Sequence, residues 1–345
     1  MKPYVLGIDI GGTNTVIGIV DARGSVIASD SIKTAKHSKL EDYIDELYTT
    51  ASRLIENNDA TDKIHGIGIG APNANYYTGI IEQGVNLPWP TPIPLARLIS
   101  EKFGIPVAIT NDANAAAIGE MTYGAARGLK DFIMITLGTG VGSGIVINGQ
   151  MVYGHDGFAG ELGHVIVKRN NGRLCGCGRT GCLEAYCSAT GVARTAREFL
   201  EIRNEPSSLR NLPIEDITSK DVYDAAINGD NLAKDVFEYT GKILGEAMAD
   251  MTVFSSPEAF ILFGGLSKSG ELLLKPLRNA MDKNMLGVFK GKPKVMLSEL
   301  KEADAAVLGA SALGWEAKPL QPAQAAPAVP CLLYTSPSPR DYAAS

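Results

Sequence analysis

The feature that most limits the possible folds of this chain is a glycine-turned hairpin that occurs twice. Each copy is an apolar run, a glycine-rich turn and a second apolar run, as expected for two short β-strands. The first copy covers 5–10, 11–14 and 16–20, and the second covers 132–137, 138–142 and 144–147. The sequence therefore predicts two related halves, each of which opens with a hairpin.

Helices and further strands alternate after both hairpins. Helical periodicity predicts helices at 40–55, 95–103, 113–123, 190–202, 219–227, 232–254 and about 303–315, and buried-type runs predict strands at 26–32, 64–69, 107–110 and 260–263. This alternation predicts an α/β fold with mixed sheets and helices outside them. Two such halves resemble the two-lobed plan of actin-like, ribonuclease-H-like ATPases, in which both hairpins face one cleft.

The expected lobes follow from this repeat. The small lobe is 1–112 plus about 302–318, and the large lobe is 113–301 with a cysteine-rich insertion at 160–187. The last helix is expected to cross back to the small lobe, since its small residues allow close packing. Those small residues are Ala305, Ala306, Gly309 and Ala310. The tail at 319–345 is rich in Pro, Ala and Ser without a period, so we expect it to be disordered or foreign to the native protein.

Composition excludes several classes. The net charge of −6 argues against broad nucleic-acid binding, which requires a basic face. No apolar run approaches the length of a membrane span, and the N-terminus leads directly into a strand without a signal-peptide pattern. Four of the five cysteines lie between Cys175 and Cys187. Such clustering favours a metal site in a reducing, cytoplasmic setting over a disulfide framework.

The two hairpin turns are candidate phosphate-binding loops. Backbone N–H groups of glycine turns can surround phosphate oxygens, and a strand-end acid can hold Mg²⁺ through water. The nucleotide-side candidates are Asp9, Gly11, Gly12, Thr13 and Asn14 in the first half, and Gly138, Thr139 and Gly140 in the second. For one turn alone, a hairpin that simply needs glycine is equally plausible, but the second copy favours phosphate binding. Neither turn matches a dinucleotide fingerprint or a Walker loop.

Two further motifs leave alternatives open. Gly264-Gly265 lies between a strand and a helix and could let adenosine approach the backbone, or could be an ordinary turn. Asn111-Asp112 lies where a strand ends and a helix begins. Asp112 could accept a proton from an attacking hydroxyl, as phosphoryl transfer requires. From spacing alone, helix capping by Asp112 is the favoured interpretation.

A compact set of metal ligands lies in the insertion. His164, Cys175, Cys177 and Cys182 supply one imidazole and three thiolates, which is a complete tetrahedral set for structural Zn²⁺. Cys187 lies further along the chain and is expected to be a buried thiol. Glu161 and Glu184 flank the ligands and could line a polyol pocket or face solvent.

Taken together, these motifs resemble the ROK family of repressors, open-reading-frame proteins and sugar kinases. The resemblance covers about 4–315 and rests on both loops, on the Glu-Leu-Gly-His segment and on the Cys-Gly-Cys-Gly-x-x-Gly-Cys-Leu-Glu run. It implies ATP- and Mg²⁺-dependent phosphorylation of a hexose at O6, and often a homodimer or homotetramer. It also implies Asp112 as the base and Asn86, Asn111, Glu161, His164 and Glu184 as sugar contacts. Pro88-Trp89 departs from the Gly-Trp of many relatives, which leaves that pocket rim less certain.

The resemblance leaves the substrate open. Glucose, giving glucose 6-phosphate, is the leading candidate. The alternatives are N-acetylglucosamine, N-acetylmannosamine, mannose, allose and fructose. A sugar-responsive transcription repressor is a remote alternative, because Asp9 lies too near the start for a preceding DNA-binding domain. A non-catalytic sugar-binding protein is disfavoured, because Asp9, both loops and Asp112 are all present.

Overall fold

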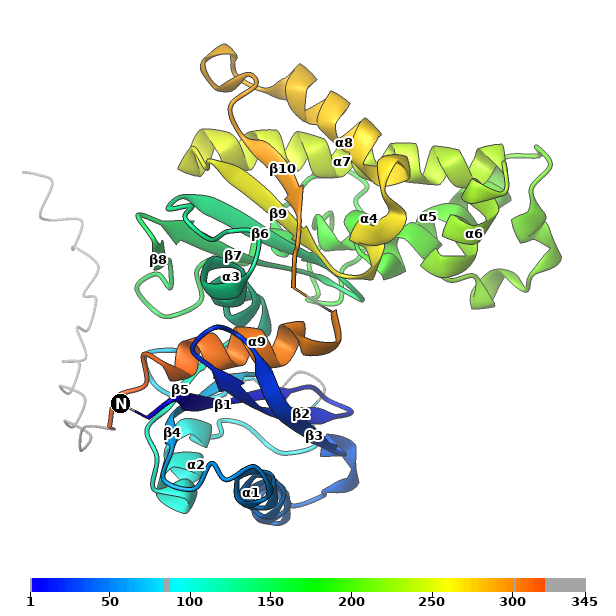
Figure 1. The fold of residues 1–345 in the computed structure, drawn as a ribbon. Helices are drawn as coiled ribbons and strands as arrows, with labels where there is room; N and C mark the ends of the chain where they lie inside the picture. The colour runs from blue at the N-terminus through cyan, green and yellow to red at the C-terminus, as the bar shows by residue number, and fades with distance from the viewer. Residues whose placement is uncertain (1, 84–86, 301, 320–345) are drawn as a thin grey trace, which may run out of the picture.

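The computed structural model describes residues 2–83, 87–300 and 302–319. These residues form two five-stranded sheets, one above the other in Figure 1, with helices between and outside them. The predicted two-lobed α/β architecture is therefore confirmed. None of the described helices is long and apolar enough to cross a membrane. Asn86 and the tail from 320 onward lie outside the described residues.

The first sheet has the strand order β3-β2-β1-β4-β5. Its strands are β1 (Tyr4–Ile10), β2 (Thr15–Asp21), β3 (Val26–Ile32), β4 (Ile64–Gly70) and β5 (Val107–Thr110). The first three strands form an antiparallel meander, and β4 and β5 add to β1 in parallel. Two helices, α1 (Leu40–Asn57) and α2 (Leu95–Phe103), contribute apolar side chains to the core of this sheet.

The second sheet repeats this topology in the order β10-β9-β6-β7-β8. Its strands are β6 (Phe132–Leu137), β7 (Val141–Ile147), β8 (Gln150–Met151), β9 (Ala259–Phe263) and β10 (Lys294–Leu297). Again three strands form an antiparallel meander and two add in parallel. The strand after each glycine turn begins at once, as the repeat predicted.

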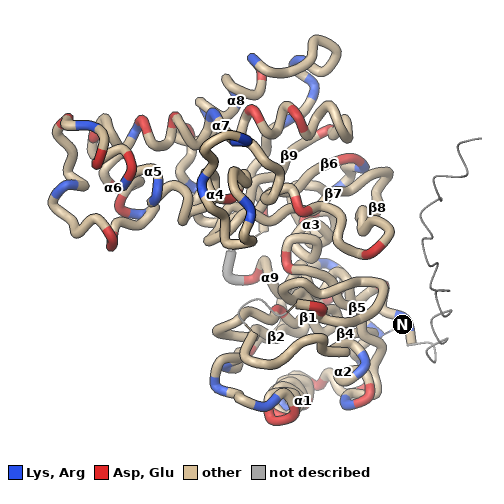
Figure 2. Tube along the Cα trace, turned by 180° about the vertical axis from the view of Figure 1, so that it is seen from behind, with Lys and Arg blue, Asp and Glu red and all other residues tan. Residues whose placement is uncertain are grey.

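The second half contains additional helices, most of them between β8 and β9. They are α4 (Glu184–Cys187), α5 (Ala189–Ile202), α6 (Ser219–Ile227), α7 (Asn231–Ser255) and α8 (Glu271–Asn284). Their apolar faces form one core with β6 and β9. Figure 2 shows acidic and basic residues interspersed along both halves of the molecule.

Two helices lie between the sheets (Figure 1), namely α3 (Asp112–Tyr123), which follows β5, and α9 (Glu302–Gly314), which follows β10. They occupy equivalent places in the two halves and contact each other at two glycines, where a Cβ on Gly119 would lie 2.8 Å from Gly309 Cα. The helix α9 also packs on the first sheet, because a Cβ on Gly68 would lie 1.9 Å from the Ala310 oxygen. Ala305 and Ala310 are buried as their small size predicted, whereas Ala306 is exposed.

Candidate active site and metal centre

Each of the two hairpin turns is closed by a backbone hydrogen bond between turn residues. In the first, the Gly11 N–H donates to the Asn14 oxygen at 2.9 Å. In the second, the Gly138 N–H donates to the Gly140 oxygen at 3.1 Å. Thr13 and Thr139 are exposed at the tips. Both turns thus present short, accessible backbone segments, which suits phosphate contact.

Two carboxylates meet beside the first turn. Asp9 is near the end of β1, and Asp112 is the first residue of α3. Both lie next to Gly70 at the end of β4, where a Cβ would be 3.5 Å from Asp9 Oδ1 and 3.9 Å from Asp112 Cα. Burial, with the charge of Asp112 as a second cause, raises the pKa of Asp9 to about 6. A cation at this position would relieve that electrostatic cost.

The start of α3 corrects one interpretation drawn from the sequence. The cap of this helix is Asn111, whose side-chain oxygen accepts from the Asn114 N–H at 2.7 Å. Asp112 lies one position inside the helix and accepts only from the adjacent Ala113 N–H, at 2.8 Å. Asp112 is exposed, and its other carboxylate oxygen has no partner among the described residues. Its carboxylate is therefore available for chemistry.

Further acids from the insertion lie near Asp112. Glu161 precedes the short 3₁₀ turn Leu162–His164, and its pKa is raised by partial loss of water, with Asp112 and Glu184 also contributing. Glu184 begins α4, and its Oε2 accepts from the Val141 N–H at 3.0 Å. This bond places Glu184 directly against the second hairpin turn, where a Cβ on Gly140 would lie 2.4 Å from the same oxygen. The carboxylates of Glu161 and Glu184 thus lie between Asp112 and the second hairpin turn.

Gly264-Gly265 also lies beside the second turn. Gly264 has φ of +100°, and a Cβ there would meet the Leu137 oxygen at 2.6 Å. The chain continues as a 3₁₀ turn over Gly265–Ser269 before α8 begins. A side chain at Gly264 would therefore separate β9 from the end of β6, next to Gly138.

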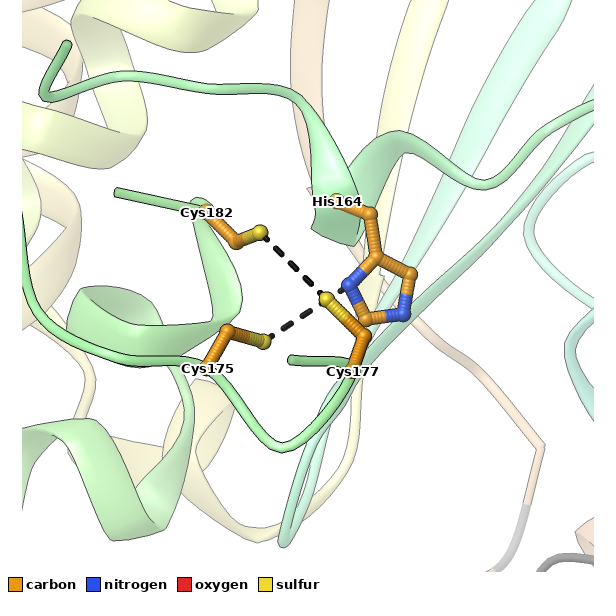
Figure 3. Close-up of side chains that lie close together, drawn as sticks. All are labelled: His164, Cys175, Cys177 and Cys182. Carbon is orange, nitrogen blue, oxygen red and sulfur yellow. Dashed lines mark hydrogen bonds between the residues drawn. The ribbon is translucent and has the colours of Figure 1, made fainter. Parts of the chain in front are cut away.

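His164, Cys175, Cys177 and Cys182 form the candidate metal centre (Figure 3). Their ligand atoms all lie within 4.8 Å of one another. The sulfurs of Cys177 and Cys182 are 3.7 Å apart, and the Cys175 sulfur is 3.8 Å from His164 Nδ1. Zn–S bonds of about 2.3 Å give a tetrahedral edge of about 3.8 Å, so this donor set fits Zn²⁺. Cys187, by contrast, is fully buried and donates to the Thr240 oxygen, as expected of a structural thiol.

The insertion around this centre is held by features that local sequence patterns did not reveal. A Cβ on Gly181, whose φ is +84°, would lie 1.9 Å from the Lys168 oxygen, so the loop closes only with glycine there. Arg173 is buried and donates to the Ala185 oxygen at 3.0 Å and to Glu198 at 2.6 Å. The only sequence signal for Arg173 was its position two residues before the first cysteine.

Twin glycine hairpins, a strand-end acid and a helix-start acid on two repeated lobes define the actin-like ATPase class. The family model described as the ROK family matches residues 5–317, and the chain belongs to this family.

Relatives named glucokinase match this chain over nearly their whole length. A protein named glucokinase from Halalkalibacterium halodurans is 36% identical over 91% of this chain and 95% of its own. A solved ROK family glucokinase from Streptomyces griseus, in complex with glucose and AMPPNP, is 33% identical, with a TM-score of 0.75 over 91% of this chain and 99% of that chain. A xylose repressor from Caldicellulosiruptor bescii is 29% identical over 90% of this chain and 77% of its own length.

Proposed function

We propose that this protein transfers the γ-phosphoryl group of ATP to the O6 hydroxyl of a hexose, with glucose as its main substrate. The observation that carries the proposal is the carboxylate of Asp112, which is exposed and does not cap α3. It lies beside Asp9 and near Glu161. Relatives named glucokinase at 32–36% identity, and a neighbour solved with glucose and AMPPNP, support the choice of substrate.

Asp112 acts as the general base. Its free oxygen accepts the proton of the sugar hydroxyl as that oxygen attacks the γ-phosphorus and the bond to the β-phosphate oxygen breaks. Assistance of this kind is worth roughly 10²–10⁴ in rate. Asn111 fixes the start of α3 through its cap and thereby sets the position of Asp112.

The nucleotide side uses both hairpins. The turns at 11–14 and 138–140 contact the phosphates through backbone N–H groups, and Gly264-Gly265 lets the adenosine end approach the strand ends. Asp9 would hold Mg²⁺ through its water shell, since this cation prefers oxygen ligands and keeps several waters. Mg²⁺ held there would supply neutralisation of the charge on the transferred phosphate. A pKa of about 6 leaves Asp9 mostly ionised at neutral pH.

The sugar side uses Glu161, Glu184, Asn111 and the imidazole of His164, with Asn86 as a further contact. His164 turns its Nδ1 toward Cys175, which leaves Nε2 free for a sugar hydroxyl. A closed ligand set has no open position for a reactive water, so we assign Zn²⁺ a structural role. Zinc bound by these four residues would fix the orientation of His164 and of the insertion.

An ADP-release assay across hexoses and N-acetylhexosamines tests the proposal. We expect turnover with glucose and a product whose phosphate is located on O6 by NMR. N-acetylglucosamine, N-acetylmannosamine, mannose, allose and fructose are the alternative substrates, and a preference for one of them would redirect the assignment. No turnover with any sugar, combined with sugar-sensitive DNA binding in a gel shift, would favour a repressor instead.

Three structural assignments belong to the same proposal. The lobes are 1–112 with about 302–318, and 113–301, and the cleft between them closes on ATP and sugar. The protein works as a homodimer or homotetramer, which light scattering after size exclusion would test. The three clustered thiols of the candidate metal centre suggest a reducing, cytoplasmic compartment.

A further inference from the structure

The second hairpin turn is held from outside its own sheet. The helix α5 begins at Ala189, whose N–H donates to the Gly138 oxygen at 2.8 Å. The next residue, Thr190, donates its side-chain hydroxyl to the Thr139 oxygen at 3.0 Å. The start of α5 thus binds two successive carbonyl groups of a loop that lies about fifty residues earlier in the chain.

These two bonds also set the direction of two amide groups. A trans peptide unit is planar, so its C=O and N–H point in opposite directions. With the carbonyls of Gly138 and Thr139 directed at α5, the N–H groups of Thr139 and Gly140 point away from it. Neither N–H has a hydrogen-bond partner within the described part of the chain. Successive free N–H groups of this kind form a concave anion site.

We propose that Thr190 is a nucleotide-positioning residue. Its hydroxyl fixes the peptide between Thr139 and Gly140 so that the Gly140 N–H faces a phosphate oxygen of ATP. The inference rests on the proposed function, because it deepens the nucleotide side of that same site. It assigns the start of α5, which directly follows the insertion, a role at the phosphate loop.

The local structure separates this role from a general contribution to stability. Thr190 is exposed and takes no part in the apolar core. The cap of α5 is Ser188, whose hydroxyl accepts from the Gly191 N–H at 3.0 Å. Loss of the Thr190 hydroxyl therefore leaves the helix capped and the core intact, and it frees only the loop peptide.

The test compares Thr190→Val, which keeps the shape but loses the hydroxyl, with Thr190→Ser, which keeps the hydroxyl. The exposed Thr61, which makes no side-chain hydrogen bond to the described residues, gives the matched control Thr61→Val. Kinetics give the KM for ATP and for glucose, and calorimetry gives the Kd for AMPPNP. One lost hydrogen bond predicts a roughly twofold to tenfold rise in the KM for ATP and the Kd for AMPPNP with Thr190→Val.

Thr190→Ser and Thr61→Val should both match the wild type, and the KM for glucose should stay unchanged in all three variants. An unaltered Kd for AMPPNP in Thr190→Val would overturn the inference, as would an equal rise in the KM for glucose or a similar loss in Thr190→Ser. Calorimetry keeps this test separate from the proposed function. A wild-type protein that binds AMPPNP but phosphorylates no sugar would contradict the kinase assignment alone.

Discussion

At the scale of single residues, the electrostatics of Asp9 link folding and catalysis. The unfolded chain has the ordinary carboxyl pKa of 3.8, whereas the folded protein has about 6. The folded state therefore binds this proton more tightly. The stability that Asp9 contributes is fully present below about pH 4 and is lost as the pH rises through about 6.

This sign gives a prediction for Asp9→Asn without Mg²⁺ or nucleotide. Asparagine carries no charge, so the variant should unfold with a free energy about 1–3 kcal/mol higher than the wild type at neutral pH. This gain in unfolding free energy should shrink toward zero near pH 4. In a separate binding measurement, the same variant should no longer bind Mg²⁺-ATP. Urea unfolding across pH measures this, with exposed Asp250→Asn as the control. A gain that is independent of pH would show that burial does not raise the pKa of Asp9.

Residue-scale detail was the hardest part to predict from the sequence. Asn111 and Asp112 are adjacent and both are good capping residues, so only the backbone conformation decides which one caps α3. Asn111 has the extended conformation that a cap requires. The favoured interpretation, with Asp112 as the cap, was therefore wrong. The grouping of the four candidate metal ligands was easier to predict, because their chemistry and spacing allow few other uses.

At the scale of elements, the glycines of the first sheet decide how α9 packs. The sequence indicated that the small residues of α9 would pack on the small lobe, but it did not show which strands would receive them. Gly7 and Gly68, on β1 and β4, supply that surface, because a Cβ on Gly7 would lie 2.4 Å from the Val307 oxygen. From the sequence alone, a glycine inside a strand is expected to weaken that strand. Its role in packing becomes visible only when the partner helix is in place.

Gly68→Ala should therefore be strongly destabilising. The added methyl would overlap the Ala310 backbone, and neither a sheet nor a helix backbone moves easily. We expect a loss of about 4 kcal/mol or more, or no folded protein, by urea unfolding. Gly287 meets nothing within 4 Å, so Gly287→Ala should be nearly neutral. Equal stability of the two variants would contradict the packing of α9 described above.

At the scale of the whole molecule, the repeat seen in the sequence is a repeat of topology. Both sheets share one strand order. Hydrophobic periodicity predicted the two hairpins and the alternation of helices and strands after them, but it gave no strand order within a sheet. Contacts between distant segments were not predictable. Glu120 in α3 is fully buried and accepts from the Ala125 N–H at 2.7 Å and from the Ser298 hydroxyl. It ties α3 to the segment that leads into α9, yet no local pattern links residues so far apart.

Metal content is a second property of the whole molecule. We expect close to one zinc ion per chain by elemental analysis. Its removal by a chelator should lower the melting temperature, because metal binding and folding of the insertion are coupled. It should also weaken sugar binding through His164. Cys187→Ser leaves the ligand set intact and is the control for general loss of a thiol. Full stability and full activity without zinc would refute the structural role of the metal.

The most direct test of the central claim is a pair of measurements on Asp112→Asn. The carboxamide keeps the shape of the side chain but accepts a proton poorly. We predict that kcat falls by roughly 10²–10⁴ while the Kd for glucose, measured by calorimetry, stays within a few-fold of the wild type. A near-normal kcat with glucose, or with whichever sugar the wild type turns over, would contradict the assignment of Asp112 as the base.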